Sequence, residues 1–180
     1  MKKQLYCGSS CVKYILEKNL IDTDNIKSDM IWISELALSL KQNGLSNLHI
    51  YCYNSKLYTE FINAKINLSF DGFKYLKELE NQNIQIVEKN ISINSFASEI
   101  DNCKYMILCV ESSVFNNDTS MVGGHYVILN GRKGNKVKVI NPIKEKYEIK
   151  TLNINFLIKA CKDYGAWRII IMEEKRWLNL

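Results

Sequence analysis

The chain has 180 residues, of which 47% are hydrophobic and 24% are charged, as in folded globular proteins rather than disordered ones. The formal net charge of +5 comes from lysines spread along the chain, without an arginine-rich block, which argues against a nucleic-acid-binding protein. No segment reaches the roughly 20 apolar residues of a membrane span. The sequence contains one proline and no Pro- or Ser-rich linker, so residues 1–180 are expected to form a single domain.

The cysteines are scattered and include no C-x-x-C pair. Only two histidines are available to share a metal with them, so neither a zinc site nor another cofactor is expected. The N-terminus lacks the pattern of a secretion signal, which favours reduced thiols in the cytoplasm. The six cysteines are Cys7, Cys11, Cys52, Cys103, Cys109 and Cys161.

The first expected element is a helix that carries Cys7 on its first turn. Gly8 allows close backbone approach, and the hydroxyls of Ser9 and Ser10 can satisfy the first free N–H groups. The positive end of the helix dipole favours thiolate, which predicts a lowered pKa and a nucleophilic Cys7. The alternative is that Cys7 is a small buried apolar residue, as most free cysteines are.

The remaining elements follow from hydrophobic periodicity and from stop signals such as Asn43-Gly44. Because helices come first and antiparallel strands later, the pattern predicts an α+β fold with segregated halves. The expected helices cover 9–19, 31–42, 56–62, 71–82, 93–101 (capped by Ser92 or Asn94) and 153–162. The expected strands cover 48–53, 84–87, 105–110, two hairpin strands around a turn at 131–135, and 166–172.

The hairpin is expected to hold a second functional group. His125 opens its first strand, and the second strand ends at Asn141-Pro142, so His125 and Asn141 are predicted to face each other. A cysteine nucleophile needs a base held by a third group, and an Asn carboxamide can accept the imidazole N–H. The other histidine, His49, lies in an apolar run and is expected to sit on a strand.

The polar segment from Glu111 to Val122 is predicted to be a loop that leads into this hairpin. One interpretation is a solvated connection, and the other is a lid or specificity loop beside the site. Gly123 and Gly124 then follow, and they are candidate substrate-binding residues because a substrate backbone could pass close to them.

These segments resemble the papain-like cysteine peptidases, most closely the family that removes double-glycine leader peptides in bacteriocin export, with its stand-alone soluble relatives. The resemblance implies a papain-like fold with N-terminal helices packed on an antiparallel sheet. It also implies that Cys7 is the nucleophile, His125 the base and Asn141 the orienting residue. The resembling segments are Cys7-Gly8-Ser9-Ser10-Cys11, Gly124-His125-Tyr126-Val127, Asn141-Pro142, and Trp32 to Leu40 with Asn43-Gly44.

The chain departs from that family in two places. The peptidases usually carry an aspartate where Asn141 stands, although Asn does the same job elsewhere in the papain-like group. They also place an oxyanion-hole glutamine six residues before the cysteine, where this chain has Met1. Gln4 is the nearest glutamine and is the candidate oxyanion residue, although its spacing of three residues gives a different geometry.

Three functions fit these residues. The first is a peptidase; the second forms the same acyl-thioester on Cys7 but passes the acyl group to an amine, which is amide synthesis of the transglutaminase kind; the third is a catalytically inactive binding module. A nucleophile at residue 7 leaves no room for an inhibitory pro-segment, and a basic chain suits an acidic carrier protein bearing a thioester. These features favour acyl transfer, with peptide cleavage as the alternative.

Overall fold

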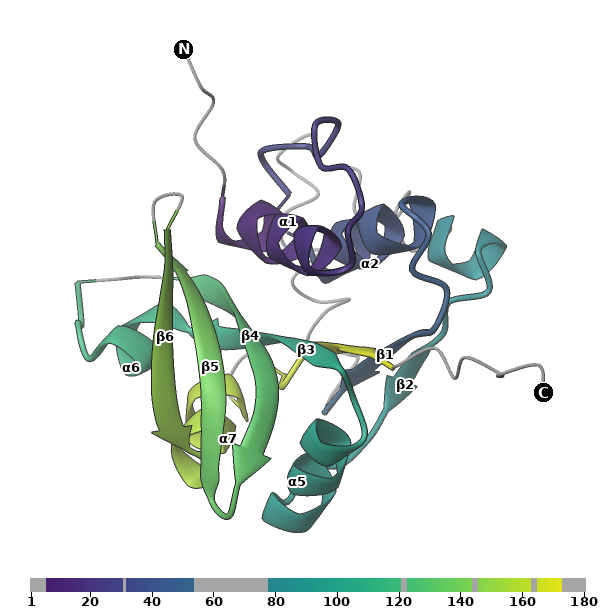
Figure 1. Ribbon diagram of the computed structural model, residues 1–180. Coiled ribbons are helices and arrows are strands. Elements are labelled where there is room, and N and C mark those ends of the chain that lie inside the picture. The colour runs from purple at the N-terminus through teal and green to yellow at the C-terminus, as the bar shows by residue number, and fades with distance from the viewer. Residues whose placement is uncertain are drawn as a thin grey trace, which may run out of the picture.

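The computed structural model describes residues 6–30, 32–53, 78–120, 123–143, 146–162 and 165–172 (Figure 1). Within these ranges the chain combines helices with one mixed sheet, so an α+β fold is shown. The helices are α1 (Cys7–Lys18), α2 (Ile33–Gln42), α5 (Ile93–Asp101), α6 (Ser112–Asn116) and α7 (Ile154–Lys162). The strands are β1 (Leu48–Cys52), β2 (Ile86–Glu88), β3 (Tyr105–Glu111), β4 (Gly124–Lys133), β5 (Lys136–Ile143), β6 (Lys146–Asn153) and β7 (Arg168–Ile171).

The described part of the sheet has seven strands in the order β2-β1-β7-β3-β4-β5-β6. Neighbouring strands are antiparallel except for β1 and β2, which pair in parallel from Ile50 opposite Ile86. The expectation of an antiparallel sheet is therefore wrong at this edge. The strands β4, β5 and β6 form a meander at the opposite edge, where His125 and Asn141 lie.

Helices cover both faces of the sheet. Figure 1 shows α1 and α2 above the sheet and α5 below it. The helices α1 and α2 pack on one hydrophobic core, and residues of α5, α6 and α7 belong to a second, separate core. In β3, Ile107 belongs to the first core and Leu108 to the second, because successive strand residues point to opposite faces. The prediction of segregated helical and sheet halves is therefore wrong, although the fully apolar run of β3 is typical of a strand buried on both faces.

Most predicted elements lie within a few residues of the observed ones. The helix α5 has the predicted bounds, and the Ser92 hydroxyl caps it by accepting from the N–H of Ser95. The helix α2 ends at Gln42 with Asn43 as its C-cap, and Gly44 follows with a φ of +94°. Residues 78–81 are helical, whereas the helix expected at 56–62 and the first part of the one at 71–82 lie outside the described residues.

Two expectations near the later hairpin are wrong, and one strand was not predicted. The segment predicted as a loop from Glu111 contains the helix α6. The strand β4 continues through an irregularity between Leu129 and Arg132 to Lys133, so the turn to β5 spans only residues 134–135. The strand β6 was not predicted, and it pairs with β5 along its full length.

A buried ion pair joins α5 to β7 in the second core. The Arg168 side chain is fully buried, and its guanidinium donates to both carboxylate oxygens of Glu99, at 2.6 and 2.9 Å. Lys89 also contacts Glu99, at 2.9 Å. Because either charge alone would be costly in this core, the pair fixes where α5 docks on the sheet.

We expect Glu99→Gln to lower the free energy of unfolding by about 3–5 kcal/mol, because it leaves the buried Arg168 charge without a carboxylate. Asp101→Asn is a matched control in the same helix, since it breaks the more exposed pair between Asp101 and Arg132 and should cost about 0–1 kcal/mol. Urea unfolding monitored by circular dichroism measures both values. Equal losses in the two variants would contradict the role assigned to the buried pair.

Candidate active site

The start of α1 is fixed by contacts with the segment that precedes α2. The Tyr6 N–H donates to the Ser28 carbonyl at 2.9 Å, and the Met30 N–H donates to the Ser9 hydroxyl at 3.0 Å. A Cβ on Gly8 would lie 2.6 Å from the Met30 carbonyl oxygen, so only glycine fits this approach. The close approach predicted for Gly8 is confirmed.

The capping role predicted for the serines is wrong. Tyr6 occupies the N-cap position of α1, and no side chain caps the helix there. The Ser9 hydroxyl instead accepts from Met30, and the Ser10 carbonyl accepts from the Tyr147 hydroxyl of β6 at 3.2 Å. The serines therefore tie the first turn of α1 to its surroundings. The backbone N–H groups of Cys7 and Gly8 contact the Cys7 side chain.

Cys7 is the first residue of α1 and lies half-buried against the first core. Burial raises the pKa of the Cys7 thiol above its usual value of 9.0, and this effect outweighs the opposing backbone hydrogen bonds from Tyr126, Gly8 and Cys7 itself. The predicted lowering of this pKa is therefore wrong. The helix start does favour the thiolate, but desolvation of the sulfur is the larger effect, so the resting group is a neutral thiol.

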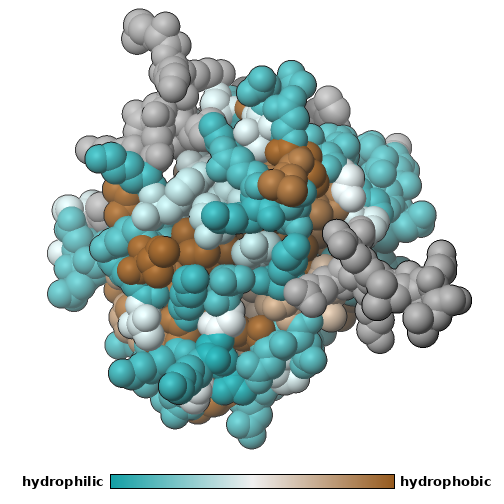
Figure 2. All heavy atoms as spheres, in the orientation of Figure 1, coloured by the Kyte–Doolittle hydropathy of each residue, from teal (hydrophilic) through white to brown (hydrophobic). Residues whose placement is uncertain are grey.

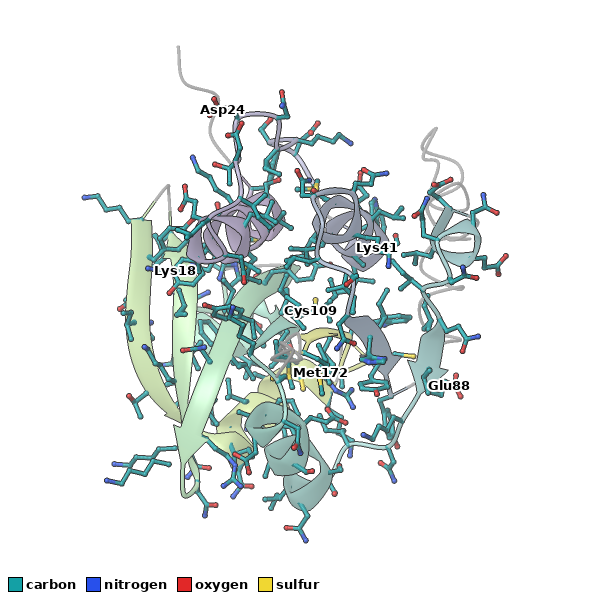
Figure 3. All side chains as sticks on the ribbon, turned by 45° about the vertical axis from the view of Figure 1, so that its right-hand side comes forward. Lys18, Asp24, Lys41, Glu88, Cys109 and Met172 are labelled. Atoms are coloured by element: carbon teal, nitrogen blue, oxygen red, sulfur yellow. The ribbon has the colours of Figure 1, made fainter. Side chains whose placement is uncertain are left out.

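The sulfur of Cys7 meets the sheet at β4. Its hydrogen bond from Tyr126 places it beside the residue that follows His125. Cys109, which pairs with Tyr126 across β3 and β4, lies in the interior (Figure 3), and burial followed by the nearby Cys7 raises its pKa to about 12. The thiol thus lies over the beginning of β4, on the side of the sheet covered by α1.

The predicted contact between His125 and Asn141 is confirmed. His125 Nε2 and Asn141 Oδ1 are 2.6 Å apart, and Asn141 is almost completely buried. Burial lowers the pKa of His125 below its usual 6.5, and this outweighs the bond to Asn141, which raises it. The positive charge of Lys150 lowers the pKa further, so the ring is neutral near pH 7.

No hydrogen bond joins the Cys7 thiol to the His125 ring in the part of the chain that the structure describes. The thiol reaches β4 from the side of α1, whereas the ring lies 5.9 Å from the Phe115 ring of α6. Both groups lie at the same end of β4 but on opposite faces of the sheet. The thiol is on the face covered by α1, whereas His125 pairs with Val110 of the second core. The β4–β5 ladder stops at the pair of Ile128 and Ile140, short of His125, so the strands are not paired beside the two groups.

Three site residues were not singled out from the sequence. Phe115 packs beside the His125 ring, Glu148 accepts from the Asn141 amide at 3.4 Å, and Lys150 binds Glu148 at 3.0 Å. The available signal was the alternation of charged residues with Tyr147 and Ile149 from Lys146 to Lys150, which is typical of an exposed edge strand. Recognising that strand would have placed Glu148 and Lys150 on the same face as each other.

The other candidate residues have the following positions. Gly124 pairs with Glu111 at the start of β4, and Gly123 precedes it with a φ of +109° and open space where a Cβ would lie. Both glycines lie next to His125, and their substrate-binding role stays a prediction. Gln4 lies outside the described residues, so its oxyanion role stays a prediction. His49 is exposed on β1 and stacks on Tyr51 at 6.1 Å, away from the site.

Neither a metal centre nor a membrane span is found in the described ranges. Those ranges hold no group of three or more His, Cys, Asp or Glu side chains arranged to bind a metal ion. None of their helices combines the length and the apolar character needed to cross a membrane. Comparison with protein-family models, with curated proteins and with solved structures found no match to this chain.

The raised pKa of Cys7 predicts how this thiol reacts with iodoacetamide. Because only the thiolate is alkylated, the rate at Cys7 should be low at pH 6.5 and should keep rising as the pH passes 9.0. Peptide mapping by mass spectrometry follows each cysteine, with half-buried Cys103, whose pKa is raised to about 12, as the internal comparison. Rapid alkylation of Cys7 at pH 6.5 would instead show a thiolate stabilised by a protonated His125.

Proposed function

We propose that the protein is a papain-like thiol acyltransferase, which forms an acyl-thioester on Cys7 and passes the acyl group to an amine. The observation that supports this most directly is the 2.6 Å bond between His125 and Asn141, at the strand end where the Cys7 sulfur also lies. A thiol, an imidazole and a group that orients the imidazole are the three parts that such chemistry needs. The papain-like fold itself is part of the proposal.

In the proposed reaction, Asn141 Oδ1 accepts the Nε2–H of His125, which leaves the Nδ1 lone pair free to act as a base. As the Cys7 sulfur attacks the thioester carbonyl of the donor, Nδ1 takes the thiol proton and then gives it to the departing donor thiolate. The amine next attacks the acyl-Cys7 carbonyl, its proton moves to Nδ1, and the Cys7 sulfur leaves and recovers that proton. The N–H groups at the start of α1 are suited to hold the negative oxygen of each tetrahedral intermediate.

This mechanism requires the thiol and Nδ1 to meet when the substrate is bound. Catalytic hydrogen bonds are often long or absent in ligand-free proteins and tighten in the substrate complex. The unpaired end of the β4–β5 ladder provides a place where an acyl group could lie between the two. A neutral thiol and a neutral imidazole fit proton transfer during the attack, rather than a preformed ion pair.

Burial of the site favours transfer over hydrolysis. Cys7 and His125 are both partly buried, and burial is the largest influence on the pKa of each. Excluding water protects an acyl-enzyme until a positioned amine attacks it. The resemblance of the sequence to double-glycine leader peptidases makes peptide cleavage the second candidate, since it uses the same acyl-enzyme.

The proposed acyl donor is an acidic carrier protein that bears a thioester. On the surface seen in Figure 2, hydrophobic residues form small groups separated by hydrophilic ones, so a charged partner is favoured over an apolar one. The net charge of +5 would attract an acidic carrier and speed its encounter with the site. A cytoplasmic location belongs to the same proposal.

Substitutions in the three groups test the site. Cys7→Ala and His125→Ala should each lower turnover by on the order of 10⁴-fold or more, because nucleophile and base act as a unit. His49→Ala is the matched control and should leave turnover unchanged, since that residue is exposed on β1. Steady-state kinetics with each purified, folded variant gives the values. Full activity of Cys7→Ala would reject the nucleophile.

The Asn141→Asp variant should remain active but change its pH dependence. A carboxylate beside His125 favours the charged imidazolium, so the pKa of His125 should rise from its lowered value. The acid limb of kcat/KM, which lies below pH 6.5 in the parent protein because neutral His125 is required, should therefore move to higher pH. A pH–rate profile measures it, and a limb that stays in place would argue against His125 as the base.

The reaction type is tested by offering two substrates separately: an acyl-carrier thioester with a free amine, and a peptide that ends in double glycine. Transfer predicts an acyl mass increase on the intact protein, absent in Cys7→Ala, and an amide product that forms faster than the free acid. The reaction with the carrier should slow as salt rises. Peptide cleavage without amide formation would establish the peptidase instead, and failure of both with Cys7 unreactive would indicate a binding module.

A further inference from the structure

The side chain of Asn141 can adopt two orientations that differ in chemistry. Its carboxamide carries an acceptor oxygen and a donor nitrogen of nearly equal size, so a half-turn of the amide exchanges them. With Oδ1 toward His125, the ring must carry its proton on Nε2, which leaves Nδ1 as a base. With Nδ2 toward His125, the proton must move to Nδ1, and the ring can no longer take a proton from Cys7 there.

Glu148 lies where it can decide between these orientations. It is directly opposite Asn141 in the antiparallel pair of β5 and β6, so both side chains project from the same face of the sheet. Asn141 Nδ2 donates to Glu148 Oε2 at 3.4 Å. An ionised carboxylate only accepts hydrogen bonds, so turning the amide over would set Oδ1 against another acceptor.

Glu148 is itself held in its ionised form. The Lys150 ammonium lies 3.0 Å from Glu148 Oε2, the same oxygen that Asn141 contacts. The pKa of Glu148 is lowered, chiefly by its hydrogen bond from Lys150 and in smaller part by Asn141. The ammonium also lies 5.7 Å from the centre of the Phe115 ring, which in turn packs beside His125. Two series of contacts therefore connect β6 to the imidazole: Glu148 contacts it through Asn141, and Lys150 contacts it through Phe115.

We propose that Glu148 is a positioning residue that fixes the Asn141 amide with its oxygen toward His125, and thereby selects the Nε2–H tautomer of the ring. Lys150 supports it by holding the carboxylate in place. The inference deepens the proposed function, because this tautomer is the one that can accept the Cys7 proton. The tautomer itself, however, is a property of the resting protein and can be measured without any substrate.

The test uses ¹⁵N NMR of the imidazole nitrogens above pH 7, where His125 is neutral. With only two histidines in the chain, His49→Gln assigns the signals. The parent protein should show the Nε2–H tautomer at His125. Glu148→Ala should shift the ring toward a mixture with the Nδ1–H tautomer, and Glu148→Gln, whose side-chain oxygen can still accept from Asn141, should restore the parent spectrum.

A charge-swapped variant, Glu148→Lys with Lys150→Glu, provides the sharper measurement. It keeps the ion pair and the net charge but points a donor at Asn141, so the amide should turn over and the Nδ1–H tautomer should dominate. Glu88→Ala is the matched control, because Glu88 ends the strand at the opposite edge of the sheet (Figure 3) and should leave the spectrum unchanged. A parent-like His125 spectrum in both Glu148→Ala and the swapped variant would overturn the proposal.

Turnover separates this inference from the proposed function. Glu148→Ala should lower kcat by about 10-fold to 100-fold with KM unchanged, as loss of an outer partner of a functional imidazole does. If the tautomer shifts as expected while the parent protein shows no acyl transfer, the positioning role stands and the proposed function fails. If transfer occurs but the tautomer does not respond to position 148, the proposed function stands and the positioning role fails.

Discussion

The contact on which the site depends is the close packing of the first turn of α1 against the backbone at residues 28–30. Gly8 permits an approach that any Cβ would block, and the hydrogen bonds of Tyr6 and Ser9 hold the two segments together. This packing sets the position of the Cys7 sulfur over β4, because the helix axis and its N-terminus are fixed at the same point. The Tyr147 hydroxyl of β6 donates to the Ser10 carbonyl in the same turn of α1. The strand that carries Glu148 is therefore also tied to this turn.

The electrostatics of the site follow from burial rather than from the helix dipole. A helix N-terminus favours an anion by about 0.3–1 kcal/mol in exposed positions, whereas one pKa unit corresponds to about 1.4 kcal/mol. Removing the sulfur from water raises the pKa of Cys7 by more than the surrounding N–H groups lower it. The same burial lowers the pKa of His125, so both groups rest in their neutral forms.

The sequence was most informative where a signal is local. The Ser92 cap, the Asn43-Gly44 stop and the apolar run of β3 each depend on neighbouring residues, and the corresponding elements lie close to their predicted bounds. The facing of His125 and Asn141 was also predictable, because hairpin pairing brings the two strand ends together.

The predictions that were wrong or missing depend on information that the local sequence does not carry. Which face of the sheet a helix covers depends on the topology, and desolvation of Cys7 depends on segments far away in the chain. The strand β6 was missed because its outer edge carries charged residues such as Lys146 and Lys150, which protect an exposed edge but resemble a polar connection. The consequence was that Glu148, which comes from that strand, was absent from the predicted site.

The neutral resting state has a consequence for the choice of acyl donor. A neutral thiol attacks only as its proton leaves, which makes it a weaker nucleophile than a preformed thiolate. A thioester carbonyl is more electrophilic than an amide carbonyl and its thiolate departs more easily, so an activated donor places a smaller demand on this pair. The burial of Cys7 therefore supports the proposed reaction, transfer from an activated acyl group.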